Sequence, residues 1–302
     1  MRLKISRLYS SSIEDVTQYP PQVFKEDFSE PEEKGKKMSV LQIWNTAGVA
    51  STLAAWMDKI FGTRSFVITR RKFDPHGHTV YGSTYDEGTW IFALRCLSQA
   101  FWRDVVHIHD FDKLVPILKK IYPHKQVLLH YHGTRIRGNW KERRKYWSAA
   151  DAILISTPDL FEGAPEDTIY LPNPVNTKRF NENISLVKHP KKGFHVEYGA
   201  LEVAREYARQ NGLSLCLFER NKTPLPQEIF AQELSKYEYY IDVKRGLKGN
   251  ILEALSLTGL EALACGCKVI DWKGDTRVGL PYEHRPEYAA KYLFKIYEEI
   301  LG

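Results

Sequence analysis

The sequence has little of what marks a secreted or membrane-spanning protein. Its 302 residues include only four cysteines, and no apolar run approaches the roughly 18 to 20 residues of a membrane span. The basic start MRLKISRLYSSS has no apolar core of a secretory signal. Cys96 and Cys216 lie in apolar segments, and Cys265-Gly-Cys267 has no second pair to complete a zinc site. We therefore expect reduced, buried thiols in a cytoplasmic protein.

Signatures of nucleic-acid and metal binding are also missing. The net charge of +6 indicates an anionic partner, but no RNP-type, Cys/His or helix-turn-helix pattern favours nucleic acid. No Asp-x-Asp is suited to a metal, because Asp110 and Asp112 stand where a helix is expected to begin and are interpreted as caps. His76 and His78, in DPHGH, leave open an exposed turn or a weak metal site. We predict that no metal and no cofactor is bound.

What the sequence does contain is an alternation of strands and helices. Residues 1–38, rich in Pro, Glu and Lys, are interpreted as an N-terminal extension with one strand at 2–9. Short β-branched or aliphatic runs then predict strands buried on both faces, at 39–44, 65–69, 104–109, 126–132 and 151–156. Helical periodicity separates them at 49–60, 87–102, 111–121 and 139–149. This order predicts a parallel, doubly wound sheet.

A second alternating block follows the segment LPNPVN at 171–176. It predicts helices at 197–210, 226–236 and from 258, strands at 213–218, 239–243 and 267–271, and a last helix at 286–300. The predicted fold class is α/β, with two Rossmann-like domains at 39–172 and 173–284, and residues 285–302 packing back on the first. Ligands of such sheets bind beyond the carboxyl ends of the strands, here in the cleft between the domains.

The stretch EALSLTGLEALACG contains two phrases, Glu253-Ala-Leu and Glu261-Ala-Leu, with seven residues between the two glutamates. One continuous helix is disfavoured by Gly259, which costs roughly 1 kcal/mol inside a helix. Thr258-Gly-Leu-Glu261 instead has the form of a capping box. A loop that leads into a helix N-terminus is also suited to binding an anion.

This stretch resembles the E-x7-E signature of the family-4 retaining glycosyltransferases, which have the GT-B fold. Several other segments resemble that family in the same order: the strand DVVHIH at 104–109, His132-Gly133, LPNPVNTKRF at 171–180, and the loop Asn45-Thr-Ala-Gly48 after the first strand. The resemblance runs from about residue 39 to residue 272. It implies two Rossmann-like domains that face each other across a cleft.

The resemblance also implies roles for individual residues. Glu261 would bind the ribose hydroxyls of a donor nucleotide, so three roles stay open for it: cap, ribose ligand or both. Glu253 would contact the transferred sugar, and His132 would reach it from the other domain. The diphosphate would be held by the amides of Ser256, Leu257 and Thr258, and Gly48 would also belong to the donor-binding residues.

Cations for the diphosphate are less well matched. Lys192 fits the family's G-R-x4-K-G pattern, Lys188 fits it approximately, and the Gly-Arg pair is missing, so Lys244 or Arg245 is expected to substitute. Such cations would stabilise the departing diphosphate. His107 and His109 share one strand, and we expect one to pack in the sheet and the other to face the cleft.

The predicted function is therefore a retaining glycosyltransferase that uses a UDP- or GDP-linked sugar and an acceptor that is a glycan or lipid-linked. The alternatives are an epimerase or hydrolase of the nucleotide sugar, a non-catalytic homologue that binds it, and a basic nucleic-acid-binding protein. RIRGNWKERRK at 135–145, with Trp140 and Trp147, is interpreted as a solvated helix or a contact with an anionic membrane surface, which would place the protein at the inner membrane face.

Overall fold

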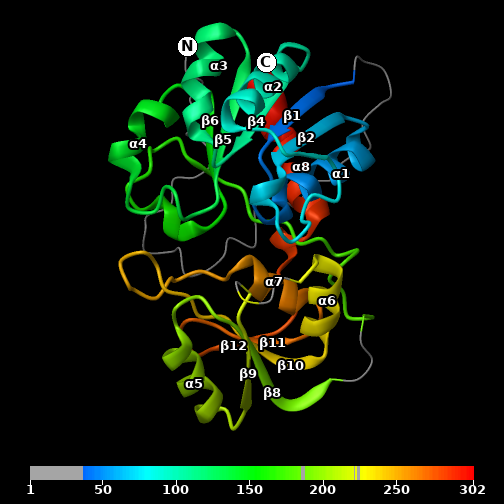
Figure 1. The fold of residues 1–302 in the computed structure, drawn as a ribbon, viewed down its shortest axis with the longest axis vertical. Coiled ribbons are helices and arrows are strands. Elements are labelled where there is room, and N and C mark those ends of the chain that lie inside the picture. Colours follow the sequence, from blue (N-terminus) through cyan, green and yellow to red (C-terminus); the bar gives the residue numbers. More distant parts are fainter. Residues whose placement is uncertain (1–36, 185–187, 221, 223–224) are drawn as a thin grey trace.

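The computed structural model describes residues 37–184, 188–220, 222 and 225–302, and Figure 1 shows them as two α/β halves, each built on its own sheet. The N-terminal sheet has the order β3-β2-β1-β4-β5-β6-β7 and is parallel throughout. Its strands are β1 (Ser39–Ile43), β2 (Arg64–Arg70), β3 (Ser83–Tyr85), β4 (Val105–His109), β5 (Gln126–Tyr131), β6 (Ala152–Ile155) and β7 (Ile169–Tyr170).

Helices cover both faces of this sheet because its central strands bury side chains on both sides. One face packs against α2 (Thr89–Phe101), α3 (Val115–Ile121) and α4 (Trp140–Trp147). The other packs against α1 (Val49–Phe61) and the C-terminal helix α8 (Pro286–Leu301). Helix α8 returns to the N-terminal half, where Phe294 stacks on Phe61 with ring centroids 3.9 Å apart.

The C-terminal sheet has the order β12-β11-β10-β8-β9, and all its pairings are parallel except that of β12. Its strands are β8 (His189–Val196), β9 (Ser214–Phe218), β10 (Tyr237–Ile241), β11 (Lys268–Ile270) and β12 (Thr276–Arg277). Its helices are α5 (Leu201–Gln210), α6 (Gln227–Ser235) and α7 (Leu257–Ala264). Apolar residues of α6, α7 and the sheet form the core of this half.

The predicted fold class is confirmed: two parallel-sheet α/β halves face each other, with the carboxyl ends of both sheets directed at the space between them (Figure 1). The pattern missed β8, a central strand, because its first four residues, His189 to Lys192, are polar or exposed. Predictions for residues 1–36, including the strand at 2–9, lie outside the described residues. Within the described part, no helix is both long and apolar enough to cross a membrane.

The prediction that Asp110 and Asp112 cap a helix is wrong, because both side chains bind groups elsewhere in the N-terminal half. Asp110, at the end of β4, accepts hydrogen bonds from Thr46 Oγ1 at 2.9 Å and from the His132 amide at 3.1 Å. Asp112 is buried and ion-paired with Arg143, and it also accepts a hydrogen bond from Tyr131 OH at 2.8 Å. At the carboxyl end of the N-terminal sheet, Asp110 therefore joins the segments after β1 and β5, and Asp112 joins the end of β5 to α4.

Candidate functional site

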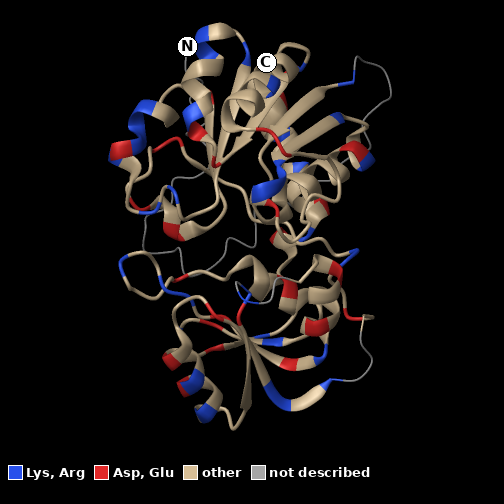
Figure 2. Ribbon diagram, viewed as in Figure 1, with Lys and Arg blue, Asp and Glu red and all other residues tan. Residues whose placement is uncertain are grey.

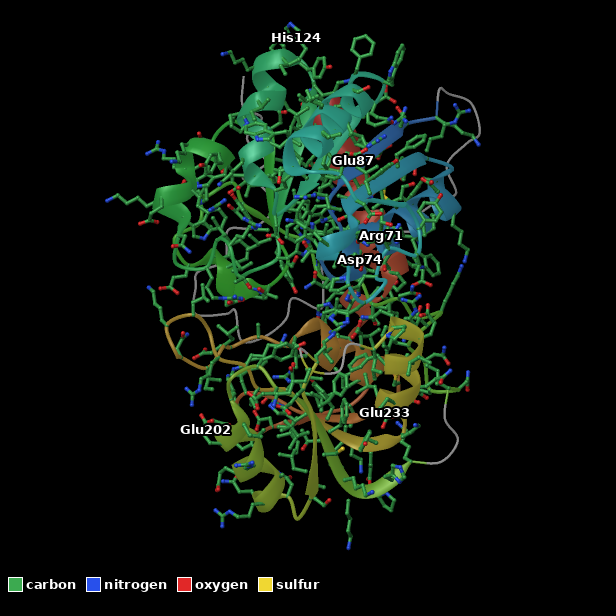
Figure 3. The ribbon with its side chains drawn as sticks, in the orientation of Figure 1. Arg71, Asp74, Glu87, His124, Glu202 and Glu233 are labelled. Atoms are coloured by element: carbon green, nitrogen blue, oxygen red, sulfur yellow. The ribbon has the colours of Figure 1, made fainter. Side chains whose placement is uncertain are left out.

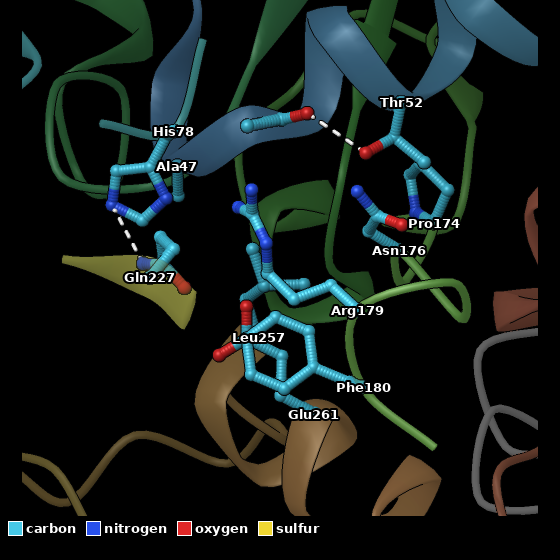
Figure 4. A pocket seen from close by; sticks show the side chains of 11 residues that line it. Ala47, Thr52, His78, Pro174, Asn176, Arg179, Phe180, Gln227, Leu257 and Glu261 are labelled. Atoms are coloured by element: carbon cyan, nitrogen blue, oxygen red, sulfur yellow. Dashed lines mark hydrogen bonds between the residues drawn. The ribbon is translucent and has the colours of Figure 1, made fainter. Parts of the chain in front are cut away.

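A pocket lies between the two halves, at the carboxyl ends of both sheets (Figure 4). The start of α1 and the loop after β2 form its N-terminal side, while α6, α7 and the segment after β7 form the other. It is lined by Ala47, Gly48, Thr52, His78, Pro174, Asn176, Arg179, Phe180, Gln227, Leu257 and Glu261. Of the residues predicted for the site, Gly48, Leu257 and Glu261 are therefore brought together here.

The start of α7 decides how Glu261 is presented. Ser256 is the N-cap, because its Oγ accepts a hydrogen bond from the Gly259 amide at 2.9 Å. The predicted capping box is therefore wrong: Thr258 lies inside the first turn, and Glu261 lies one turn further on. Glu261 has no capping role, which removes the structural explanation for its carboxylate.

The amide of Ser256 is already engaged by a carboxylate of the protein. It donates to Oδ2 of Asp242, which follows β10, at 2.7 Å. Burial raises the pKa of Asp242, against the opposing effect of Lys244 and of the hydrogen bonds from Ser256. Of the three amides expected to hold a diphosphate, that of Ser256 is therefore occupied by Asp242.

Glu261 is a buried acid without a hydrogen-bond partner among the described residues. Only 6% of it is exposed, and its carboxylate lines the pocket. Burial raises its pKa to about 8, although Arg220, Lys244 and Arg179 act in the opposite direction. A buried carboxyl group that no protein donor satisfies is suited to accept hydrogen bonds from a ligand.

Those three cations come from separate segments of the C-terminal half, and each acts on the charge of Glu261. Arg220 follows β9, Lys244 follows β10, and Arg179 lines the pocket itself (Figure 4). Lys244 lies over the ring of Tyr198, 4.2 Å from its centroid, and Arg179 is ion-paired with Glu228. Sequence reasoning missed Arg179 and Arg220. Arg179 follows the linker at 171–176 and Arg220 follows β9, and these positions are the signal that could have found them.

His78 joins the two halves across the pocket. Its Nε2 accepts hydrogen bonds from Gln227 Nε2 at 3.1 Å and from Arg220 at 3.2 Å, so Nε2 carries no proton. The loop that carries it is held by Asp74, which accepts a hydrogen bond from the His78 amide at 2.6 Å and is labelled in the N-terminal half in Figure 3. Burial, followed by the charge of Arg220, lowers the pKa of His78 to about 4. Neither alternative expected for DPHGH, an exposed turn or a weak metal site, therefore describes His78.

His132 belongs to a buried hydrogen-bond chain in the N-terminal sheet. Gln42 Oε1 lies 3.1 Å from His109 Nε2, His109 Nδ1 lies 2.9 Å from His132 Nε2, and His132 Nδ1 lies 2.6 Å from Ser156 Oγ. Since Gln42 Oε1 can only accept, each imidazole donates through Nε2 and accepts through Nδ1. Both ring nitrogens of His132 are thus engaged, and its contact with a donor sugar stays a prediction that requires one bond to be exchanged.

His107 and His109 both lie on the α8 face of the sheet, because residues two apart on a strand point the same way. The expectation that one of them faces the cleft is therefore wrong. Burial lowers the pKa of His107 to about 3 and the pKa of His109 well below its ordinary value.

Together with His130, these histidines have nitrogen atoms within 4.8 Å of one another, but the rings of His107 and His109 are stacked at 20°. Lone pairs in the planes of stacked rings run side by side and do not converge on one metal ion.

The other predicted residues lie away from the pocket. Glu253 is exposed in the loop before α7, and Arg245 is ion-paired with Glu202 on α5. Lys188 donates to Cys265 O at 2.8 Å, at the far end of α7. Lys192 is exposed four residues before the end of β8. The structure therefore does not bring the predicted lysines of the 188–192 segment to the cleft.

Solved structures with the same arrangement allow the fold to be named. The chain aligns with a glycosyltransferase involved in avilamycin A biosynthesis at a TM-score of 0.55, with 14% identity, 87% of this chain and 98% of that chain covered. The chain has the GT-B fold. A UDP-N-acetylglucosamine 2-epimerase from Rickettsia bellii aligns at 0.50, with 12% identity over 88% of this chain and 97% of that one. The sequence itself matches no protein-family model and no curated protein.

We predict that Gly259→Ala strains the start of α7. A Cβ at this position would lie 2.7 Å from Cγ of Asp242, which is buried and hydrogen-bonded to Ser256. Overpacking of this kind costs about 1–3 kcal/mol, to be measured by urea denaturation. The control is Gly88→Ala, where a Cβ meets no atom within 4 Å among the described residues. Equal losses in the two variants would contradict this account of Gly259.

We also predict a pH-dependent stabilisation by Glu261→Gln. The folded protein holds a proton on Glu261 up to about pH 8, whereas the ordinary pKa is 4.5, so the parent loses stability as the pH rises between these values. Gln does not titrate, and the stability difference in favour of the variant should therefore grow over this window. Urea denaturation at several pH values measures it, and a difference independent of pH would contradict the buried, unsatisfied carboxyl.

Proposed function

We propose that the protein is a glycosyltransferase that binds a nucleotide-sugar donor in the pocket between its two halves. The observation that carries this proposal is Glu261, a buried carboxyl group that faces the pocket with no protein partner among the described residues. A ribose offers two adjacent hydroxyl donors, which match the two oxygens of one carboxylate. Binding them would satisfy a group whose burial is otherwise unfavourable.

The diphosphate would lie beside Glu261, where Arg179, Arg220 and Lys244 come together. Breaking the bond between sugar and phosphate leaves negative charge on the departing oxygen, and cations directed at that oxygen stabilise the transition state more than the ground state. The amides of Leu257 and Thr258, in the first turn of α7, add donors at the positive end of the helix. Of the two predicted substitutes for the missing arginine, we favour Lys244, because its charge acts on Glu261.

The carrier nucleotide, the acceptor and the retention of configuration are also part of the proposal. UDP and GDP are the expected carriers, the acceptor is a glycan or a lipid-linked molecule, and retention follows from the resemblance of Glu253 to Gly266 to the family-4 signature. No protein nucleophile is assigned. Glu253 is exposed, so its contact with the sugar would need the loop before α7 to move toward the cleft.

Two observations favour a second candidate, in which the donor is bound but not transferred. Asp242 already holds the Ser256 amide, and the loop after β8, Glu197 to Ala200, contains no cation. Release of nucleotide from the donor in the presence of candidate acceptors separates the two: turnover supports a transferase, whereas binding without turnover supports the second candidate. Consumption of donor without any acceptor would indicate an epimerase or hydrolase.

The leaving-group site is tested with Arg220→Met, which keeps an unbranched apolar stem and removes the charge. Hydrogen bonds to charged groups contribute about 1.5–3 kcal/mol, so the affinity for UDP should fall roughly tenfold or more. The affinity for uridine, which lacks the phosphates, should stay within about twofold. Titration calorimetry measures both.

The matched control is Lys192→Met, which also replaces a cation by methionine. Lys192 is the lysine that the sequence favoured, and it is exposed on β8, away from the pocket. It should leave the affinity for UDP unchanged. If Lys192→Met weakens UDP binding and Arg220→Met does not, the assignment of the diphosphate site is wrong.

A further inference from the structure

Helix α2 is apolar on two opposite faces. Its inner face buries Phe92, Cys96 and Ala100 against the sheet. Its outer face and the residue that follows it expose five large apolar side chains: Trp90 (81%), Ile91 (59%), Leu94 (65%), Phe101 (56%) and Trp102 (70%). Isolated exposed apolar residues are ordinary, but a stripe along a whole helix marks an interaction surface.

Helix α3 continues this surface. The C-terminal ends of α2 and α3 are neighbours, since Tyr122 OH donates to the Leu97 carbonyl at 3.3 Å and the rings of Phe101 and Tyr122 lie 6.1 Å apart. Ile117 and Ile121 of α3 are 43% and 48% exposed. We call the seven exposed apolar residues of α2, Trp102 and α3 the α2–α3 face.

Exposed charge on and beside the α2–α3 face is mostly positive, and the acid that lies just before α2, Asp86, is ion-paired with Arg71. Neither α2 nor α3 contains an acidic residue. On these two helices, the short turn before α3 and the neighbouring α4, the exposed charged side chains are Lys113, Lys120, Lys141, Arg144, Lys145 and one acid, Glu142. Figure 2 shows this contrast, with α2 largely tan and blue segments on α3 and α4.

The basic segment at 135–145 does not supply the apolar part of such a surface. Trp140 is 4% exposed and packs edge-on against Tyr131, and Trp147 is part of the same core. Arg137 and Arg143 are ion-paired with Asp159 and Asp112. The remaining exposed cations of α4 therefore flank a surface whose aromatic residues lie on α2.

We infer that the α2–α3 face docks on an anionic lipid bilayer, with the stripe of α2 in the interface and the lysines of α3 and α4 against lipid headgroups. Tryptophan favours the boundary between hydrocarbon and water, and Trp90 and Trp102 stand at the two ends of the stripe. Cations beside apolar side chains are the combination that binds an anionic membrane surface. A protein partner would have to offer an apolar groove with an acidic rim, whereas a bilayer supplies both features.

This docking would place the N-terminal half on the membrane. His124, just after α3, lies at the end of the molecule remote from the C-terminal half (Figure 3). The pocket and the C-terminal half would therefore stay in solution, open to a soluble donor. The inference does not rest on the proposed function, because it uses none of the residues that line the pocket.

Sedimentation with vesicles tests the inference on the full chain. We expect the protein to sediment with vesicles of equal parts phosphatidylglycerol and phosphatidylcholine, and much less with phosphatidylcholine alone or at high salt. Trp90→Glu with Leu94→Glu should lower the partition coefficient by about tenfold or more, because acidic groups replace the inserted side chains. Lys113→Glu with Lys120→Glu should lower it for anionic vesicles through the loss of charge attraction.

The control is Leu247→Glu with Val278→Glu, which alters two apolar residues that are 81% and 70% exposed on the C-terminal half. It should sediment like the parent, and unchanged melting temperatures show that all variants fold. Failure of the parent to sediment, or an equal loss in the control, would overturn the inference. A change in oligomeric state on gel filtration in the α2 variant, without an effect on vesicle binding, would assign the face to a second copy of the chain.

Discussion

The hydrogen bond from the Ser256 amide to the Asp242 carboxylate fixes where α7 begins, and the geometry of the pocket depends on it. Because the helix starts at Leu257, Glu261 lies one turn inside it and faces the other half of the molecule. Gly259 is required at this point, since any side chain would overlap Asp242. Gly259, which indicates a helix boundary in the sequence, therefore lies inside the first turn of α7, where packing against Asp242 requires a glycine.

The charged groups around Glu261 are arranged so that a bound ligand would satisfy them better than they satisfy one another. Glu261 is buried with no donor among the described residues, while Arg179, Arg220 and Lys244 lie close enough to affect its pKa and form no described ion pair with it. Arg220 instead donates to His78 of the opposite half. A ligand with hydroxyl donors and an anionic group would satisfy the acid and the cations together, at a place where both halves contribute.

The sequence was sufficient to predict the fold class, because buried parallel strands are a local pattern, and the family resemblance singled out Glu261, which lines the pocket. It was insufficient for β8, whose polar first half hides a central strand. The resemblance also favoured Lys188 and Lys192, but Lys192 lies in that exposed half of β8 and Lys188 donates to Cys265 O. Side-chain direction was the other source of error. Which face of β4 carries its histidines, and which tryptophans are buried, depends on how the helices pack on the sheet, and that is not a local property.

Binding of a nucleotide ribose by Glu261 is the proposal on which the assignment of the pocket depends. Titration calorimetry of uridine and guanosine nucleotides into the parent protein and the Glu261→Ala variant measures it. The parent should bind one of these nucleotides, and the variant, whose Ser256 cap is intact, should fold normally but bind it at least about tenfold more weakly. Equal nucleotide affinity in the two proteins would show that Glu261 is not a ligand of the ribose.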